Sequence, residues 1–179
     1  MRVWIVLLRG INIGGKHVIP MKKLRELLED SGFSGVQTYI QSGNCVFRAE
    51  SRDRHHIADT VSGLIEAEFG FRPSAFVLTP HELEAALTAN PFPAGEPKAV
   101  HLQFLAGPPA EADLDGLRAV AQPGEDVALI GSVLYLYLPH GAGRSPVARK
   151  LGRYITADMT GRNIASVRKI AAMARQAAS

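Results

Sequence analysis

The sequence predicts an α+β protein of two ferredoxin-like halves packed together, each a split βαβ plait. Short apolar strands alternate with helical periodicities in the order β-α-β-β-α-β, and after a connecting helix the order starts again as β-α-β-β-α-α. The 46% hydrophobic and 21% charged content of the 179 residues suffices for a buried core. We therefore predict an N-terminal half over residues 1–79, a connecting helix and linker over 80–97, and a C-terminal half over 98–179 with basic terminal helices.

The first half follows from apolar runs separated by turn residues. Pro20 is well placed as the first residue of a helix, and Gly32 is its C-terminal cap. The segment Gln41-Ser42-Gly43-Asn44 supplies the turn of a hairpin. The strands are expected at 3–8, 36–40, 45–47 and 75–78, and the helices at 20–31 and 54–69.

A helix-start signal opens the connection to the second half. In Thr79-Pro80-His81-Glu82, Thr is an N-cap, Pro takes the first helical position and Glu the third. The Pro and Gly residues between Pro91 and Pro97 indicate a linker. Beyond it we expect strands at 100–105, 127–130 and 133–138, and helices at 114–120, 146–154 and 163–177.

Two strands are apolar on both faces, which predicts that the halves cover each other. In Val3 to Leu8 every residue is apolar, and in Val133 to Leu138 three leucines alternate with Val133 and two tyrosines. Successive side chains of a strand point to opposite faces, so neither face of these strands suits water.

The best candidate site combines two loops. In a split βαβ plait the first and second strands run parallel, so the loop after the first strand and the turn after the second emerge at the same end of the sheet. Polar side chains would form a rim there, and glycines would let backbone N–H groups approach a ligand. The predicted ligand-binding residues are Arg9, Gly10, Asn12, Gly14, Gly15, Lys16, Gln41, Ser42 and Asn44.

The first loop also resembles a nucleotide-binding phosphate loop, with Gly10 followed after four residues by Gly15-Lys16. His17 stands where the magnesium-binding hydroxyl belongs, and the following strands form a hairpin instead of parallel crossovers. An anion held by Arg9, Lys16 and the glycine amides fits better than nucleotide hydrolysis.

Positive charge gathers near the C-terminus. Residues 140–179 carry eight Lys or Arg side chains and one Asp, which suggests an anionic partner such as nucleic acid. Ser145 and Pro146 begin a helix directly after a glycine-rich loop. The predicted auxiliary basic contacts are Arg144, Arg149, Arg162 and Arg168.

Several function classes find no support. Cys45 is the only cysteine, so no internal disulfide forms, and the six histidines lack the spacing of a metal site. The first apolar run is too short for a signal peptide or a membrane span. We expect a cytoplasmic protein without cofactor, metal or membrane partner; the sequence does not indicate its oligomeric state.

Motifs across nearly the whole chain resemble the bacterial domain-of-unknown-function family 1697. They are the segment Leu8 to Lys16, the segment Tyr39 to Asn44, Asn90-Pro91-Phe92, and Thr160-Gly161-Arg162-Asn163. The resemblance implies a two-part ferredoxin-like fold without an established activity. Ile164 and Pro146 depart from the family pattern, which usually has Trp and often Lys at these positions.

These observations lead to one functional expectation with two alternatives. We expect a binding module for a phosphorylated or anionic ligand, a small molecule or nucleic acid, at the two loops. A small transferase or hydrolase using the same polar rim is the first alternative. A protein-interaction or scaffold protein without a small ligand is the second.

Overall fold

The structure is a computed structural model that describes residues 1–179. It divides into two compact units, Met1–Glu84 with Lys169–Ser179, and Ala85–Arg168. The boundaries between the units therefore fall within two helices, α3 (Pro80–Thr88) and α6 (Ile164–Ala178). None of the helices has both the length and the apolar character needed to cross a membrane.

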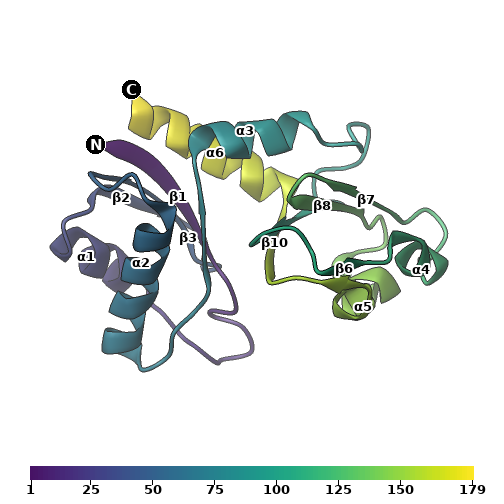
Figure 1. Cartoon of the computed structure of the whole chain (residues 1–179), viewed down its shortest axis with the longest axis horizontal. Helices are drawn as coiled ribbons and strands as arrows, with labels where there is room; N and C mark the ends of the chain where they lie inside the picture. The colour runs from purple at the N-terminus through teal and green to yellow at the C-terminus, as the bar shows by residue number, and fades with distance from the viewer. The chain divides into compact units, whose positions relative to one another are not determined.

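The first unit is built on a four-stranded sheet with the order β2-β3-β1-β4, in which all neighbours are antiparallel. Helices α1 and α2 lie along this sheet (Figure 1). The expected elements are confirmed, with shifts of a few residues at their ends. The strands are β1 (Arg2–Leu8), β2 (Ser34–Tyr39), β3 (Asn44–Ala49) and β4 (Ala75–Leu78), and the helices are α1 (Met21–Asp30) and α2 (Arg54–Phe69).

One core fills the space between this sheet and its two helices. Trp4, Val6 and Leu8 of β1 pack in the same cluster as Leu24 of α1 and Ile57 of α2. The opposite face of β1 is also buried, since Val3, Ile5 and Leu7 are at most 8% exposed. The sequence prediction that neither face of this strand meets water is confirmed.

The C-terminal end of α6 belongs to the first unit and lies beside the start of β1 (Figure 1). Val3 and Ala177 line the same surface hollow, and an ion pair joins Arg175 of α6 to Glu84 of α3. The sole cysteine, Cys45, is fully buried in β3, where it pairs with Val6 on one side and Thr38 on the other.

The second unit contains another four-stranded antiparallel sheet, with the order β10-β5-β8-β7. Helices α4 and α5 pack on it through a core that includes Leu117, Leu134 and Leu151. The strands are β5 (Val100–Leu105), β7 (Asp126–Ile130), β8 (Val133–Tyr137) and β10 (Met159–Asn163), and the helices are α4 (Leu114–Ala119), η1 (Ala142–Arg144) and α5 (Pro146–Tyr154). A short ladder pairs β6 (Glu111–Ala112) with β9 (Ile155–Thr156).

Strand β10 corrects the sequence prediction, which replaced the last strand of the second half by a helix. Its sequence Met-Thr-Gly-Arg-Asn has no alternation of apolar residues, so it lacks a strand signal. Its pairing with β5 places Gly161 opposite Gln103, and the absence of a Cβ at Gly161 leaves room for the amide of that side chain. Both units thus share the order β-α-β-β-α-β, and α6 follows the second.

Helix starts largely follow the sequence signals. The hydroxyl of Thr79 accepts a hydrogen bond from Glu82 N at 3.2 Å, and Glu82 Oε2 accepts one from Thr79 N at 2.8 Å, so α3 begins with a capping box. Ser145 caps α5 by accepting from Ala148 N at 3.1 Å. Pro20 differs from its prediction in one detail, because it is the N-cap of α1 and not its first helical residue.

Candidate functional site

The β1–α1 loop and the β2–β3 turn lie side by side, as the sequence predicted. The amide nitrogen of Asn12 donates to Gln41 O at 2.8 Å and to Ile19 O at 3.1 Å, while its amide oxygen accepts from Ile19 N at 2.7 Å. Leu8 N also donates to Gly43 O at 2.8 Å. We call residues 9–20 and 40–43 together the joined loops.

Gly43 allows this close approach. A Cβ on Gly43 would lie 2.7 Å from Leu8 Cβ and 2.7 Å from Ile11 Cδ1, closer than real Cβ contacts come. Its φ of +75° is also one that residues with a side chain rarely adopt. Only glycine therefore fits at the contact between the turn and the loop.

The tip of the β1–α1 loop is a miniature hairpin. Ile13 and Lys16 form an antiparallel bridge, with Lys16 N donating to Ile13 O at 3.0 Å. Gly14 and Gly15 between them have φ of +59° and +72°, the signs that a two-residue hairpin turn of type I′ needs. The Lys16 amide is thus already used within the turn, so this segment does not cradle phosphate as a nucleotide-binding loop does.

All three non-glycine residues with positive φ in the chain belong to the joined loops. They are Asn12 (+53°), His17 (+50°) and Ile40 (+50°). Asparagine tolerates this conformation, but a β-branched residue is a genuine outlier there and costs roughly 1–2 kcal/mol. Such strain is concentrated at functional sites in proteins, because stability alone would remove it.

His17 rests on the segment that leads into β4. Its ring stacks on Phe71 with 4.3 Å between centroids, and His17 Nδ1 lies 3.1 Å from Gly10 O. Arg9 N donates to Ser74 O at 3.0 Å. The loop is therefore supported from both sides, by the β2–β3 turn and by residues 71–74. The sequence prediction of the site did not include His17 or residues 71–74. Only the position of His17 next to Lys16 could have suggested that His17 belongs to the site.

The predicted ligand-binding residues fall into two groups. Asn12 and Asn44 are structural: Asn44 is 1% exposed and donates to Tyr39 O at 3.0 Å and Ser42 Oγ at 2.9 Å. The others reach the surface, Ser42 only in part: Arg9, Gly10, Gly14, Gly15, Lys16, Gln41 and Ser42. Arg9, Ser42 and Asn44 each make a further interaction. Lys16 is thus the cation best placed to meet a ligand.

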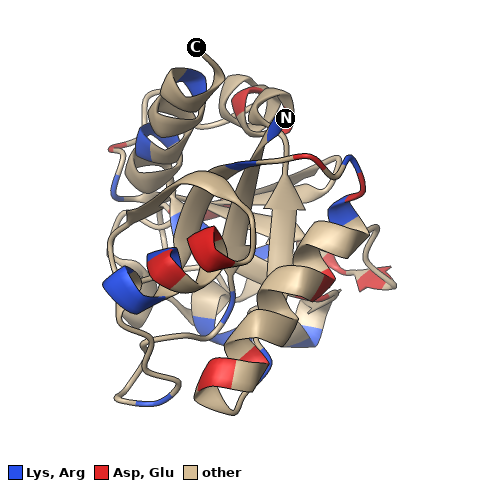
Figure 2. Cartoon of the chain, turned by 90° about the vertical axis from the view of Figure 1, so that its left-hand side faces the viewer, with Lys and Arg blue, Asp and Glu red and all other residues tan.

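No carboxylate belongs to the two chain segments that build this end of the first unit. Residues 9–25 and 31–49 contain no Asp or Glu. Lys22 and Lys23 of these segments pair with acids on the helices, at 3.9 Å from Glu26 and 3.2 Å from Glu68. In Figure 2 the acidic positions of this unit lie mainly on its helices, whereas the projecting loop carries a basic one. The local field at the joined loops favours an anion.

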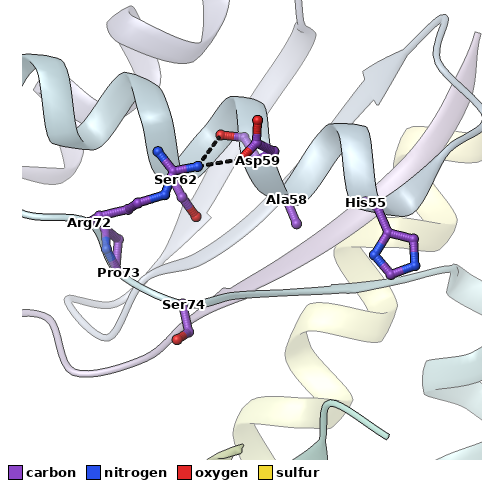
Figure 3. A pocket seen from close by; sticks show the side chains of 7 residues that line it. All are labelled: His55, Ala58, Asp59, Ser62, Arg72, Pro73 and Ser74. Carbon is purple, nitrogen blue, oxygen red and sulfur yellow. Dashed lines mark hydrogen bonds and ion pairs between the residues drawn. The ribbon is translucent and has the colours of Figure 1, made fainter.

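A second hollow of about 460 Å³ lies between α2 and residues 72–74 (Figure 3). Its one guanidinium, that of Arg72, is engaged by Asp59 and by Glu66, and these carboxylates together with their hydrogen bonds raise the pKa of Arg72. His55 lies farther along α2. With its cation already neutralised, this hollow is a poorer anion site than the joined loops.

The predicted basic contacts of the second unit do not form one group. Arg144, Arg149 and Arg168 are exposed. Arg162 is only 9% exposed and donates to Thr160 Oγ1 at 2.9 Å and Gly161 O at 2.7 Å. The prediction that Arg162 is a surface contact is therefore wrong, because β10 places this side chain inside the protein.

Two further observations concern Ser42 and the side chains that can ligate metals. Ser42 Oγ accepts from the amide of Asn44, which cannot take up the hydroxyl proton, so this contact does not activate Ser42 as a nucleophile. Groups of three or more His, Cys, Asp or Glu side chains that could hold a metal ion are not found.

Comparison with known proteins agrees with the fold. The family described as "Protein of unknown function (DUF1697)" matches residues 1–135. A solved structure, that of the conserved bacterial protein SP0830 from Streptococcus pneumoniae, is similar with a TM-score of 0.67 and 22% sequence identity, covering 96% of this chain and 98% of that one. No curated protein is significantly similar to this chain.

Proposed function

The chain belongs to the DUF1697 family, and we propose that its first unit binds a phosphorylated or otherwise anionic ligand at the joined loops. The Asn12 bridge carries the proposal, because it fixes the loop that bears Lys16 against the turn that bears Gln41. A rigid scaffold that presents polar loops is the usual setting of a binding site.

The chemistry of the joined loops suits an anion without nucleotide hydrolysis. Lys16 provides an exposed ammonium group, Arg9 a guanidinium and Gln41 an amide donor. Gly14 and Gly15 are exposed at the turn, so their N–H groups can donate as well. The absence of carboxylates in both segments removes the repulsion that an anion would meet elsewhere on the surface.

We also propose that each unit is a ferredoxin-like plait and that the protein is cytoplasmic. The antiparallel order β2-β3-β1-β4 and its counterpart β7-β8-β5-β10 are what a split βαβ arrangement requires. A single buried cysteine suits a reducing compartment.

Ligand-induced stabilisation tests the anion site. Inorganic phosphate and nucleoside monophosphates should raise the Tm of the protein, since a ligand at 100 times its Kd stabilises by about 2.7 kcal/mol. Lys16→Gln should reduce the shift. Lys22→Gln removes the same charge from α1 and should leave the shift intact. If none of these anions stabilises the parent protein, the proposal is wrong.

A second candidate, a nucleic-acid contact, is favoured by one observation on α5. Arg149, Lys150 and Arg153 of this helix and Arg144 just before it form no ion pair with a carboxylate. Arg149 and Arg153 are exposed and four residues apart, so they share one side of the helix. Four unneutralised cations within ten residues suit a phosphate backbone.

Salt dependence distinguishes this candidate. Replacing Arg149 and Arg153 by Gln should weaken duplex DNA binding and lower the slope of log K against log salt by about 1.8, since each phosphate contact contributes about 0.9. Arg52→Gln with Lys22→Gln removes the same charge from the first unit and should change the slope little. An equal loss in both double variants would contradict a contact at α5.

A further inference from the structure

The joined loops expose aliphatic side chains as well as cations. The chain has five exposed large hydrophobic residues, and three of them lie in these two short segments: Ile13 is 68% exposed, Val18 58% and Ile40 52%. Single exposed aliphatic residues are ordinary on protein surfaces. Three of them occur on two loops that the side chain of Asn12 holds together, and this concentration calls for a reason.

Ile40 supplies the strongest reason. Folding places this β-branched residue at a φ of +50° while leaving half of its side chain in water, so both its backbone and its side chain are unfavourable. Glycine or asparagine would suit the same turn position better. Both the backbone conformation and the exposed side chain of Ile40 lower stability. The presence of isoleucine here is best explained by a contact with a binding partner that is absent from the free protein.

We propose that the anionic ligand of the joined loops carries an aliphatic chain, so that its charged group meets Lys16 and its chain lies on Ile13, Val18 and Ile40. This inference rests on the proposed function for the anion and adds the apolar part. The Ile13–Lys16 bridge places a cation and an exposed aliphatic residue directly across one turn. An alkyl phosphate monoester is the simplest molecule that combines the two groups.

The small number of exposed aliphatic residues in the joined loops favours a small amphiphile over a protein partner. A stable protein interface covers roughly 800 Å² on each partner, with some 20–30 residues a side. Three aliphatic side chains on two loops are far fewer than that, and a small amphiphile needs no more. The same chemistry occurs in a lipid headgroup with its acyl chain, and the experiment must separate these two sources.

A chain-length series tests the proposal. Inorganic phosphate, ethyl, butyl and hexyl phosphate, each below its micellar concentration, are titrated into the full chain by calorimetry. Affinity should rise roughly twofold per methylene, which is about half the free energy gained when a methylene is fully buried. Lys16→Gln should weaken every member of the series by a similar factor.

The aliphatic residues are tested with a matched control. Ile13→Ser combined with Ile40→Asn should remove the dependence on chain length, so that the double variant binds hexyl phosphate no more tightly than inorganic phosphate. Ile130→Ser changes an aliphatic residue that is 42% exposed at the end of β7, and it should leave the series intact. Unfolding in urea checks that each variant is folded.

The outcomes separate this inference from the proposed function. Measurable affinity that does not rise with chain length, or a rise that survives in the double variant, overturns the aliphatic contact and leaves the anion site standing. No binding of any phosphate overturns both. Binding to phosphatidylglycerol vesicles without binding of monomeric hexyl phosphate would show that a bilayer, and not a soluble amphiphile, is the source.

Discussion

The two sheets have equivalent strand orders, yet the connections at corresponding ends are built differently. In the first unit the side chain of Asn12 holds the connection after β1 in addition to backbone bonds, and all of the chain's positive-φ residues other than glycine lie in the joined loops. In the second unit the connection after β5 is held by backbone bonds, with Ala106 N and Ala110 N donating to Asp158 O and Thr156 O at 2.9 Å.

The chemistry of these connections differs as well. The second unit places Glu111 and Asp113 in its connection, and Asp113 caps α4 by accepting from Gly116 N at 2.8 Å. Its β7–β8 turn is only Gly131-Ser132. One unit thus has a regular, acidic and capped connection, while the other has a strained, acid-free one with exposed aliphatic residues. The difference supports the proposal that the ligand site lies in the first unit.

The largest effect should come from breaking the contact between the joined loops. Gly43→Ala forces a Cβ against Leu8 and Ile11 at a φ of +75°, and the strain and overpacking together should lower the free energy of unfolding by about 3 kcal/mol. Urea denaturation measures it. Gly14→Ala has a similar φ but open space around the new Cβ, so it should cost only about 1 kcal/mol. Equal losses in the two variants would contradict the packing argument.

Removing the side-chain bridge should have the next largest effect. Asn12→Ala deletes three hydrogen bonds and leaves the Ile19 N–H without its acceptor, which should cost about 2 kcal/mol in unfolding free energy. Gln41→Ala is the control for the unfolding free energy alone, since Asn12 bonds to the backbone of Gln41 and this bond survives. The anion-induced rise in Tm should fall in Asn12→Ala. A full response there would mean that the bridge does not position Lys16.

Relieving the backbone strain at Ile40 should raise the free energy of unfolding, whereas the two preceding changes lower it. Ile40→Gly removes the β-branched side chain from a left-handed position, and the gain should exceed the added chain entropy by about 0.5 kcal/mol. The variant is therefore expected to be slightly more stable in urea and weaker in binding alkyl phosphates. Loss of stability would show that Ile40 contributes to the fold.

The smallest expected effect is a pH dependence in the second unit. Burial lowers the pKa of His101, although a hydrogen bond with the Lys98 backbone opposes this, and His101 Nε2 has no partner. The unfolded chain takes up a proton near pH 6.5 while the folded one stays neutral, so stability should fall as the pH drops through 6.5. Urea unfolding at several pH values should show a weaker decline in His101→Gln. If stability declines equally in His101→Gln, titratable groups other than His101 cause the decline.

The sequence predicted the elements and the meeting of two loops because both depend on local patterns and topology. Helix α2 and strand β4 have the bounds expected from their periodicity and turn residues. The side chains inside the site were harder to assign. Polar residues of a loop look equally available in sequence, so Asn12 and Asn44 were taken for ligand contacts although they hold the backbone in place.

The remaining differences come from long-range packing. Ile40 was expected inside a strand, but β2 ends at Tyr39, and Ile40 lies exposed in the turn whose Gly43 contacts Leu8. Strand β10 and the burial of Arg162 depend on pairing with β5, which no local pattern in residues 159–163 signals. Such features follow from neighbours distant in sequence.

The lone thiol of Cys45 is an internal probe of how often the protein opens locally. It is fully buried between β1 and β2, next to the turn that carries Gly43. The side chain belongs to the core between the sheet and helices α1 and α2, so an alkylating reagent reaches it only when that core opens, and the rate of modification under native conditions reports how often this happens. A ligand that clamps the neighbouring segments would slow this chemistry without any label being introduced.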